Sequence, residues 1–184
     1  MLRYILFIFI SYTLFSCRNY KEQNNFFQQN CSHASDLVKN QLKKISFPDE
    51  KFGVLIPQDW EVEKRLGKDS SKSIVGLDTF NLYSNNRVRS IALTKYGEPV
   101  DDIDSFFQSS LIAVEQKYKL IDHGKLKINK KSIPWLLIED DEYYSVTYYI
   151  ESTNLFMINT TVSIDSIYLS NLCELTEYVK TIDW

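Results

Sequence analysis

The chain has 184 residues, with 24 acidic and 21 basic side chains and a formal net charge of −3. Its length fits a single domain, and its 44% hydrophobic content excludes a disordered or collagen-like chain. Because this slightly acidic chain lacks the basic excess that nucleic-acid binding uses, we expect no nucleic-acid partner.

The first residues have the pattern of an export signal. One positive charge, on Arg3, precedes the 12-residue stretch Tyr4–Phe15, which is interrupted only by Ser11 and Thr13. A helix that spans a bilayer needs roughly 20 apolar residues, so this stretch is short for a membrane span. Its length fits the apolar region of a cleaved signal peptide.

The signal ends in Leu14-Phe15-Ser16-Cys17, which resembles the lipobox of bacterial lipoproteins, although Phe15 replaces the usual small residue. The resemblance implies a signal peptide over 1–16 and fatty acylation of Cys17, for example with palmitate. Two or more acyl chains make a stable membrane anchor, whereas one chain binds only marginally. An ordinary secretory signal and an uncleaved signal anchor remain the alternatives.

Arg18 bears on the destination of the protein. In the familiar sorting rule, Asp after the lipidated Cys retains a lipoprotein at the inner membrane. Arg18 therefore favours the outer membrane, facing the periplasm, with display at the cell surface as the alternative.

Two further cysteines, Cys31 and Cys173, remain if Cys17 carries lipid. An even pair in an oxidising compartment allows one disulfide. It would close a loop of about 140 residues and stabilise the fold by roughly 5 kcal/mol. The alternative is two separate thiols.

Residues 17–46 are expected to hold the lipidated Cys, a polar tether and a first helix. The segment 18–30 is polar except for Phe26 and Phe27. Within Ser35–Ile45 the apolar residues recur at helical spacing, which predicts a helix.

A folded domain is predicted over 47–184, beginning with strands. Phe52–Ile56 is a short apolar run that ends at a Pro-containing turn, and Trp60 opens a second strand. Ile74–Tyr83 and Val88–Tyr96 are predicted to form a hairpin. The next segment has apolar residues at steps of three and four through Tyr118, which predicts a helix. Either Asp101 or Asp102 can cap that helix.

Four more strands and a last helix follow. The strands are predicted at Leu120–Ile128, Ser132–Glu139, Tyr143–Glu151 and Leu155–Ile164, and the helix begins near Asp165. Several of these strands are apolar on both sides, so both faces need cover. The order predicts an α+β fold with a mainly antiparallel sheet covered by helices on both faces.

The segment Phe52–Trp60 resembles the opening strand, proline and tryptophan of PsbP-like and DcrB-like domains. The strand run Leu120–Ile164 and the closing segment Thr181–Trp184 also fit that fold, an α/β/α sandwich. Members of this fold are mostly binding modules. The resemblance transfers a scaffold and no site residues.

Motifs of catalysis are not evident in the sequence. His33 lies two residues after Cys31, but one Cys and one His fall short of a four-ligand metal site. His123 could serve as a general base, yet no nucleophile motif accompanies it. We therefore expect no enzyme activity, no metal and no cofactor.

Two clusters remain as candidate binding features. Glu139–Glu142 provides four consecutive carboxylates, which a calcium site or, more simply, a solvated turn would explain. Aromatic side chains gather nearby, and a binding surface would use Tyr143, Tyr144, Tyr148 and Tyr149. Half-buried strand residues would explain these tyrosines equally well.

The function expected from the sequence is that of a lipoprotein held in the membrane by Cys17, whose domain is a non-catalytic module that binds an envelope protein. The alternative is a periplasmic small-molecule binder with a tyrosine-rich groove. A hydrolase that uses His123 is the third hypothesis.

Overall fold

The structure is a computed structural model that describes residues 26–31, 41–47, 52–65, 77–96, 100–165 and 167–183. The predicted signal peptide, Cys17 and His33 lie outside these residues. The helices are α2 (Phe26–Asn30), α3 (Ile103–Glu115) and α4 (Tyr168–Lys180); the strands are β1 (Leu42–Ser46), β2 (Gly53–Pro57), β3 (Glu61–Arg65), β4 (Asp78–Tyr83), β5 (Arg89–Lys95), β6 (Lys119–Ile128), β7 (Lys131–Glu139), β8 (Tyr143–Glu151) and β9 (Leu155–Ser163). Within the described ranges, none of these helices has the length and apolar character to cross a bilayer.

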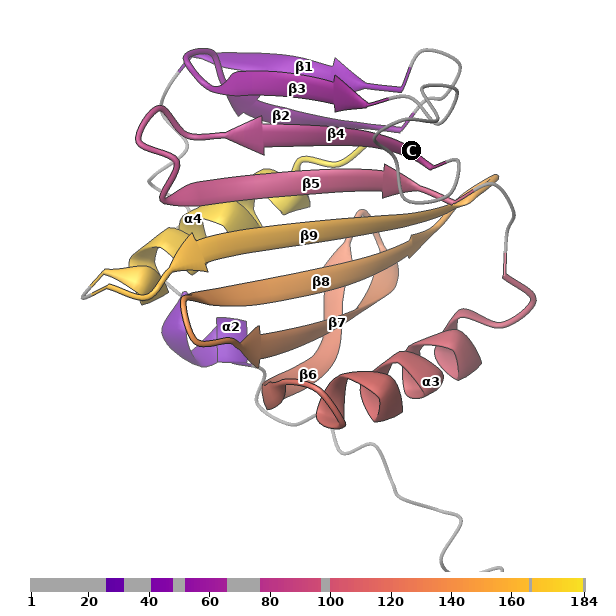
Figure 1. The fold of residues 1–184 in the computed structure, drawn as a ribbon. Helices are drawn as coiled ribbons and strands as arrows, with labels where there is room; N and C mark the ends of the chain where they lie inside the picture. Colours follow the sequence, from indigo (N-terminus) through magenta and orange to yellow (C-terminus); the bar gives the residue numbers. More distant parts are fainter. Residues whose placement is uncertain are drawn as a thin grey trace, which may run out of the picture.

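Seven strands form one sheet in the order β3-β4-β5-β9-β8-β7-β6, and all neighbouring strands are antiparallel (Figure 1). β1 and β2 form a separate antiparallel pair. The prediction of a mainly antiparallel sheet accompanied by helices is confirmed. The central strands β8 and β9 follow each other in the chain, whereas β5 reaches β9 only after α3 and three further strands.

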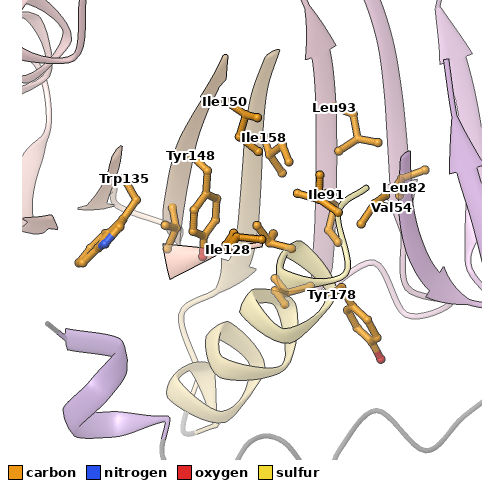
Figure 2. Packing of buried hydrophobic residues seen from close by; sticks show 14 of the residues in the cluster. Val54, Leu82, Ile91, Leu93, Ile128, Trp135, Tyr148, Ile150, Ile158 and Tyr178 are labelled. Atoms are coloured by element: carbon orange, nitrogen blue, oxygen red, sulfur yellow. The ribbon is translucent and has the colours of Figure 1, made fainter. Parts of the chain in front are cut away.

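The larger hydrophobic core lies between one face of this sheet and α4 (Figure 2). Successive side chains of a strand point to opposite faces, so every second residue of β5, β8 and β9 enters this core. Ile91, Tyr148 and Ile158 do so and are fully buried. β1, β2 and α2 contribute to the same core, which therefore joins the first described helix to the last.

A smaller core forms where α3 packs on the other face, over β7 and β8. Phe107 and Leu111 of α3 bury against Leu136 and Tyr149. The helix begins at Asp102, whose carboxylate accepts the backbone N–H of Asp104 at 2.9 Å. This cap satisfies a backbone donor that the first helical turn leaves unpaired. Asp102, one of the two predicted caps, is thus the one used.

Two predictions for the N-terminal part are wrong. The helix predicted over Ser35–Ile45 is not formed in its last part, because Leu42–Ser46 is the strand β1 and pairs with β2. The polar tether predicted over 18–30 is also too long, because Phe26–Asn30 is the helix α2 and Phe27 is buried in the larger core. The folded part therefore starts before residue 47, where the domain boundary was predicted.

Candidate functional site

The four tyrosines proposed as one binding surface lie on two faces of the sheet. Strand alternation in β8 directs Tyr144 and Tyr148 toward the larger core, and Tyr143 and Tyr149 toward the face that carries α3. Tyr148 is fully buried, and its hydroxyl lies 2.9 Å from the hydroxyl of Thr176. Tyr149 is buried beneath α3. The predicted surface is therefore wrong for Tyr148 and Tyr149, and the tyrosine-rich groove of the small-molecule hypothesis loses half of its residues.

Tyr144 belongs to a more exposed cluster at one end of the sheet. Its ring stacks on Tyr168 of α4, with 4.3 Å between the ring centroids and 20° between the planes. The connection from β9 to α4 exposes two large aliphatic side chains beside Tyr168 in the sequence, Ile164 at 45% and Ile167 at 58%. The backbone N–H of Ile164 donates to the carbonyl of Glu142 at 3.1 Å, which joins this connection to the β7–β8 turn.

The β7–β8 turn holds the four acidic residues. Glu139 forms an ion pair with Lys119 at 2.8 Å, and Asp140 accepts the backbone N–H of Asp141 at 2.7 Å. Both contacts are those of a solvated hairpin end. No group of three potential metal ligands occurs among the residues that the structure describes. We call Tyr144, Tyr168, Ile164, Ile167 and the turn Glu139–Glu142 the acidic-aromatic end.

Tyr143 and Asp140 form a coupled pair at this end. The Tyr143 hydroxyl donates to the Asp140 carboxylate, which raises the pKa of Tyr143 to about 12 and lowers the pKa of Asp140. A tyrosine with a raised pKa favours the folded state below its ordinary pKa of about 10 and loses that contribution as the pH rises toward the folded value.

We expect Asp140→Asn to return the pKa of Tyr143 toward its ordinary value, because the charged acceptor of its hydroxyl is removed. Titration of ring-labelled tyrosine by NMR measures this directly. Tyr144, which lies on the opposite face of the strand, serves as the internal reference. An unchanged Tyr143 titration in the variant would contradict the assigned cause.

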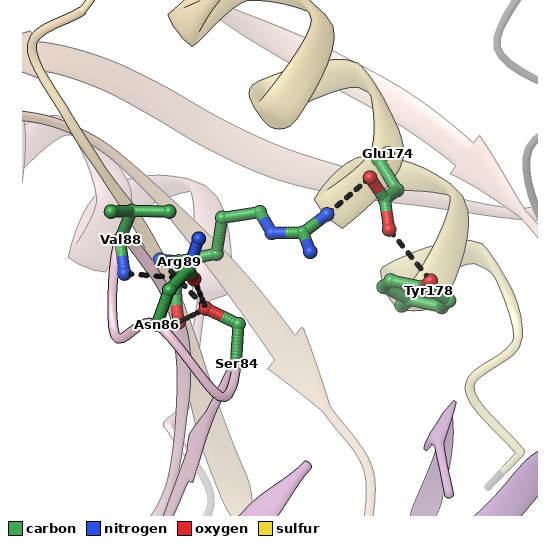
Figure 3. Close-up of polar contacts among 6 residues, drawn as sticks. All are labelled: Ser84, Asn86, Val88, Arg89, Glu174 and Tyr178. Carbon is green, nitrogen blue, oxygen red and sulfur yellow. Dashed lines mark hydrogen bonds and ion pairs between the residues drawn. The ribbon is translucent and has the colours of Figure 1, made fainter. Parts of the chain in front are cut away.

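A second polar group connects β5 to α4 (Figure 3). The Arg89 guanidinium forms an ion pair with Glu174, and the Tyr178 hydroxyl donates to the other Glu174 oxygen at 2.8 Å. Arg89 also lies 5.8 Å from the centre of the Trp60 ring, and its Nε is buried without a hydrogen-bond partner. Burial, followed by the hydrogen bond to Glu174, raises the pKa of Tyr178. All partners of this group are internal, so it fastens α4 to the sheet.

Glu174→Ala is expected to lower the free energy of unfolding by roughly 2 kcal/mol, since it leaves Arg89 with no counter-charge in a partly buried site. The side chains of Arg89 and Glu174 are 22% and 18% exposed, which lets water offset part of the loss. The double variant Arg89→Met/Glu174→Leu removes both charges and should recover most of the stability. Urea unfolding of both variants checks this, and a double variant less stable than Glu174→Ala would contradict it.

The segment that follows the predicted lipidation site is fixed to the domain at three points. Cys31 and Cys173 form a disulfide, with 5.2 Å between their Cα atoms. The Phe27 ring packs against Trp135, at 4.7 Å between centroids. The backbone N–H of Phe26 donates to the Asp122 carboxylate at 3.2 Å. Of the two arrangements left open for Cys31 and Cys173, the structure has the bonded one.

His123 lies on the face of β6 that carries α3, with its ring 6.3 Å from that of Phe107. Its backbone N–H donates to the neighbouring Asp122 carboxylate, whose other oxygen accepts the N–H of Phe26. The acid beside His123 thus has a structural role in holding α2. Cys31, which the sequence places near His33, is occupied by the disulfide.

Comparisons with known proteins support the fold and leave the function open. A solved structure with a similar fold is the solution structure of cyanobacterial PsbP (CyanoP) from Synechocystis sp. PCC 6803. It is 13% identical, with a TM-score of 0.51, and the match covers 77% of this chain and 91% of that one. No family model and no curated protein matches the chain. The described part is therefore PsbP-like in fold.

Proposed function

We propose that this chain is an envelope lipoprotein, anchored through acyl groups on Cys17, whose folded part is a non-catalytic module that docks a protein partner. The observation that carries the proposal is the attachment of the segment just behind Cys17 to the last helix through Cys31–Cys173. A disulfide suits an exported protein, and it fixes the segment that follows the anchor to the last helix of the domain.

The acidic-aromatic end is the surface that we propose for the partner. It combines exposed isoleucines, a stacked tyrosine pair and four carboxylates, and aromatic and aliphatic groups inside a polar rim are typical of protein interfaces. The positions of α3 and α4 on opposite faces further support an α/β/α arrangement of the PsbP-like type. We propose the outer membrane, facing the periplasm, as the location.

The anchor is tested by metabolic labelling with palmitate and membrane fractionation of the native protein beside Cys17→Ala. Labelling and membrane retention lost in the variant support lipidation. A variant that still fractionates with membranes and a native protein that takes up no label would overturn it.

The docking surface is tested separately, in cells, with a photocrosslinking amino acid at Ile167 and a matched control at Glu63, which is exposed on the distant strand β3. One specific protein crosslinked from Ile167 and absent from Glu63 is the expected result. Equal crosslinking patterns from the two positions would contradict the assignment of this surface.

A further inference from the structure

One edge of the large sheet carries a row of lysines. β6 is the edge strand opposite β3, and its second half leads into the turn to β7. Four lysines in this short segment are exposed, and no acidic residue lies among them: Lys125, Lys127, Lys130 and Lys131. We call these four residues the lysine rim. Lys125 forms an ion pair with Asp104 of α3 at 2.8 Å, between side chains that are 38% and 56% exposed.

Lys130 occupies a backbone conformation that suits glycine. Asn129 and Lys130 join β6 to β7 as a two-residue turn, with φ values of 48° and 68°. Hairpin turns with two positive φ angles favour Asn followed by Gly, because a side chain is strained at the second position. Asn129 matches the first position of this pattern, but Lys130 occupies the second position, where glycine would be less strained. Strained residues of this kind cluster at functional sites, which makes Lys130 a candidate for a binding role.

The rim lies within reach of the membrane that would hold the acyl chains of Cys17. Nine peptide steps separate Cys17 from Phe26, which is about 30 Å of fully extended chain. Phe26 bonds to Asp122 in the middle of β6, and Lys127 is five residues further along the same strand, or about 17 Å. α2 lies on the β6 side of the sheet, away from β3 (Figure 1).

We propose that the lysine rim binds the headgroups of anionic phospholipids in the membrane that holds the Cys17 anchor. This inference rests on the proposed lipid anchor. Each lysine close to an anionic membrane adds to binding, but the attraction falls off within a Debye length of about 8 Å. The short tether between Cys17 and Phe26 would hold β6 close to the membrane. The lysines then bind lipid at a high effective concentration, and the domain does not have to be recruited from solution. The contact turns the β6 edge toward the lipid and leaves β3 and β4 facing away.

The test uses the full lipidated protein reconstituted in vesicles of phosphatidylcholine, with or without phosphatidylglycerol. The acetylation rate of each lysine is measured by mass spectrometry. We expect roughly tenfold slower acetylation of Lys127 and Lys130 in the anionic vesicles, and recovery of the rate at high salt. Lys64 on the opposite edge strand is the internal control and should keep its rate in both vesicles.

Lys130→Gly separates lipid binding from stability. Removing the side chain relieves the turn, so we expect the melting temperature to rise, while Lys127 loses part of its protection in anionic vesicles. The matched variant Lys64→Gly changes a lysine outside the rim and should leave the protection of Lys127 unchanged. If Lys127 in the Lys130→Gly variant is protected from acetylation as strongly as in the native protein, the role of Lys130 is contradicted.

The outcomes distinguish the two proposals. Flotation of the vesicles in a density gradient first shows whether the protein is bound to them. If the protein is bound to neither kind of vesicle, the proposed lipid anchor is contradicted. If the protein is bound to both kinds of vesicle, and Lys127 and Lys130 are acetylated at the same rate with and without phosphatidylglycerol, the anchor is supported and the lysine rim does not bind anionic lipid.

Discussion

Replacing Cys31 and Cys173 together by alanine is expected to lower the free energy of unfolding by about 5 kcal/mol. The two cysteines are 142 residues apart, so the bond closes nearly the whole folded part into one loop. A crosslink of that span removes many conformations from the unfolded chain, and the loss grows slowly with loop length. Both cysteines are also buried members of the larger core, so the lost packing adds to this effect.

Urea unfolding of the double variant beside the native protein measures this effect. A reducing agent added to the native protein supplies the control, since it should shift the native curve onto that of the variant. Because α2 has five residues and cannot persist as an isolated helix, we also expect faster proteolysis near Phe26 without the bond. Identical unfolding midpoints with and without reductant would contradict the stabilising role.

The sheet and its two long helices followed from short-range patterns in the sequence. β8 shows why: every residue from Ser145 to Ile150 is buried, and the apolar side chains on both sides of this segment predicted a strand that needs cover on both faces. α3 and α4 likewise had one apolar stripe each at helical spacing, and those stripes are the faces that they bury. Patterns of this kind need no knowledge of which strands pair.

The N-terminal errors have a physical cause. Leu42 and Ile45 are three residues apart, a spacing that fits one helical turn, and the pairing with β2 that makes them a strand is not visible locally. For α2 the only signal was the pair Phe26 and Phe27 within a polar segment. A buried aromatic anchor there depends on Trp135, more than a hundred residues away, so tertiary contact decides the outcome.

The candidate site depended still more on distant contacts. The sequence marked the acidic run at 139–142 and the adjoining Tyr143 and Tyr144, but Tyr168 was not among the four tyrosines of the predicted surface. Its stacking on Tyr144 follows from the start of α4 returning to the end of β8. Arg89 and Glu174 were not predicted as partners because 85 residues separate them. The sequence hinted at this ion pair in one way: Arg89 is a charged residue at the start of β5, in which Ile91 and Leu93 are buried.

Trp135→Ala is expected to lower the free energy of unfolding by about 4 kcal/mol. Trp135 is fully buried in β7 and packs edge-on against Phe27 of α2. Gly124 of β6 pairs with Trp135 across the strands, and a Cβ added at Gly124 would come within 3.3 Å of the indole ring. The indole thus occupies the space above Gly124, which has no side chain of its own. Removal of the indole leaves a cavity between Gly124 and Phe27.

Trp135→Phe provides the matched control and should lose only roughly 1 to 2 kcal/mol. Phenylalanine keeps most of the ring contact with Phe27, and it removes the indole N–H, which is buried without a hydrogen-bond partner. Unfolding followed by circular dichroism compares the variants without depending on tryptophan emission. If Trp135→Phe were as unstable as Trp135→Ala, the ring contact with Phe27 would not be the source of the stabilisation. Because the same ring holds α2, Trp135→Ala should also expose the segment near Phe26 to protease while the disulfide remains intact.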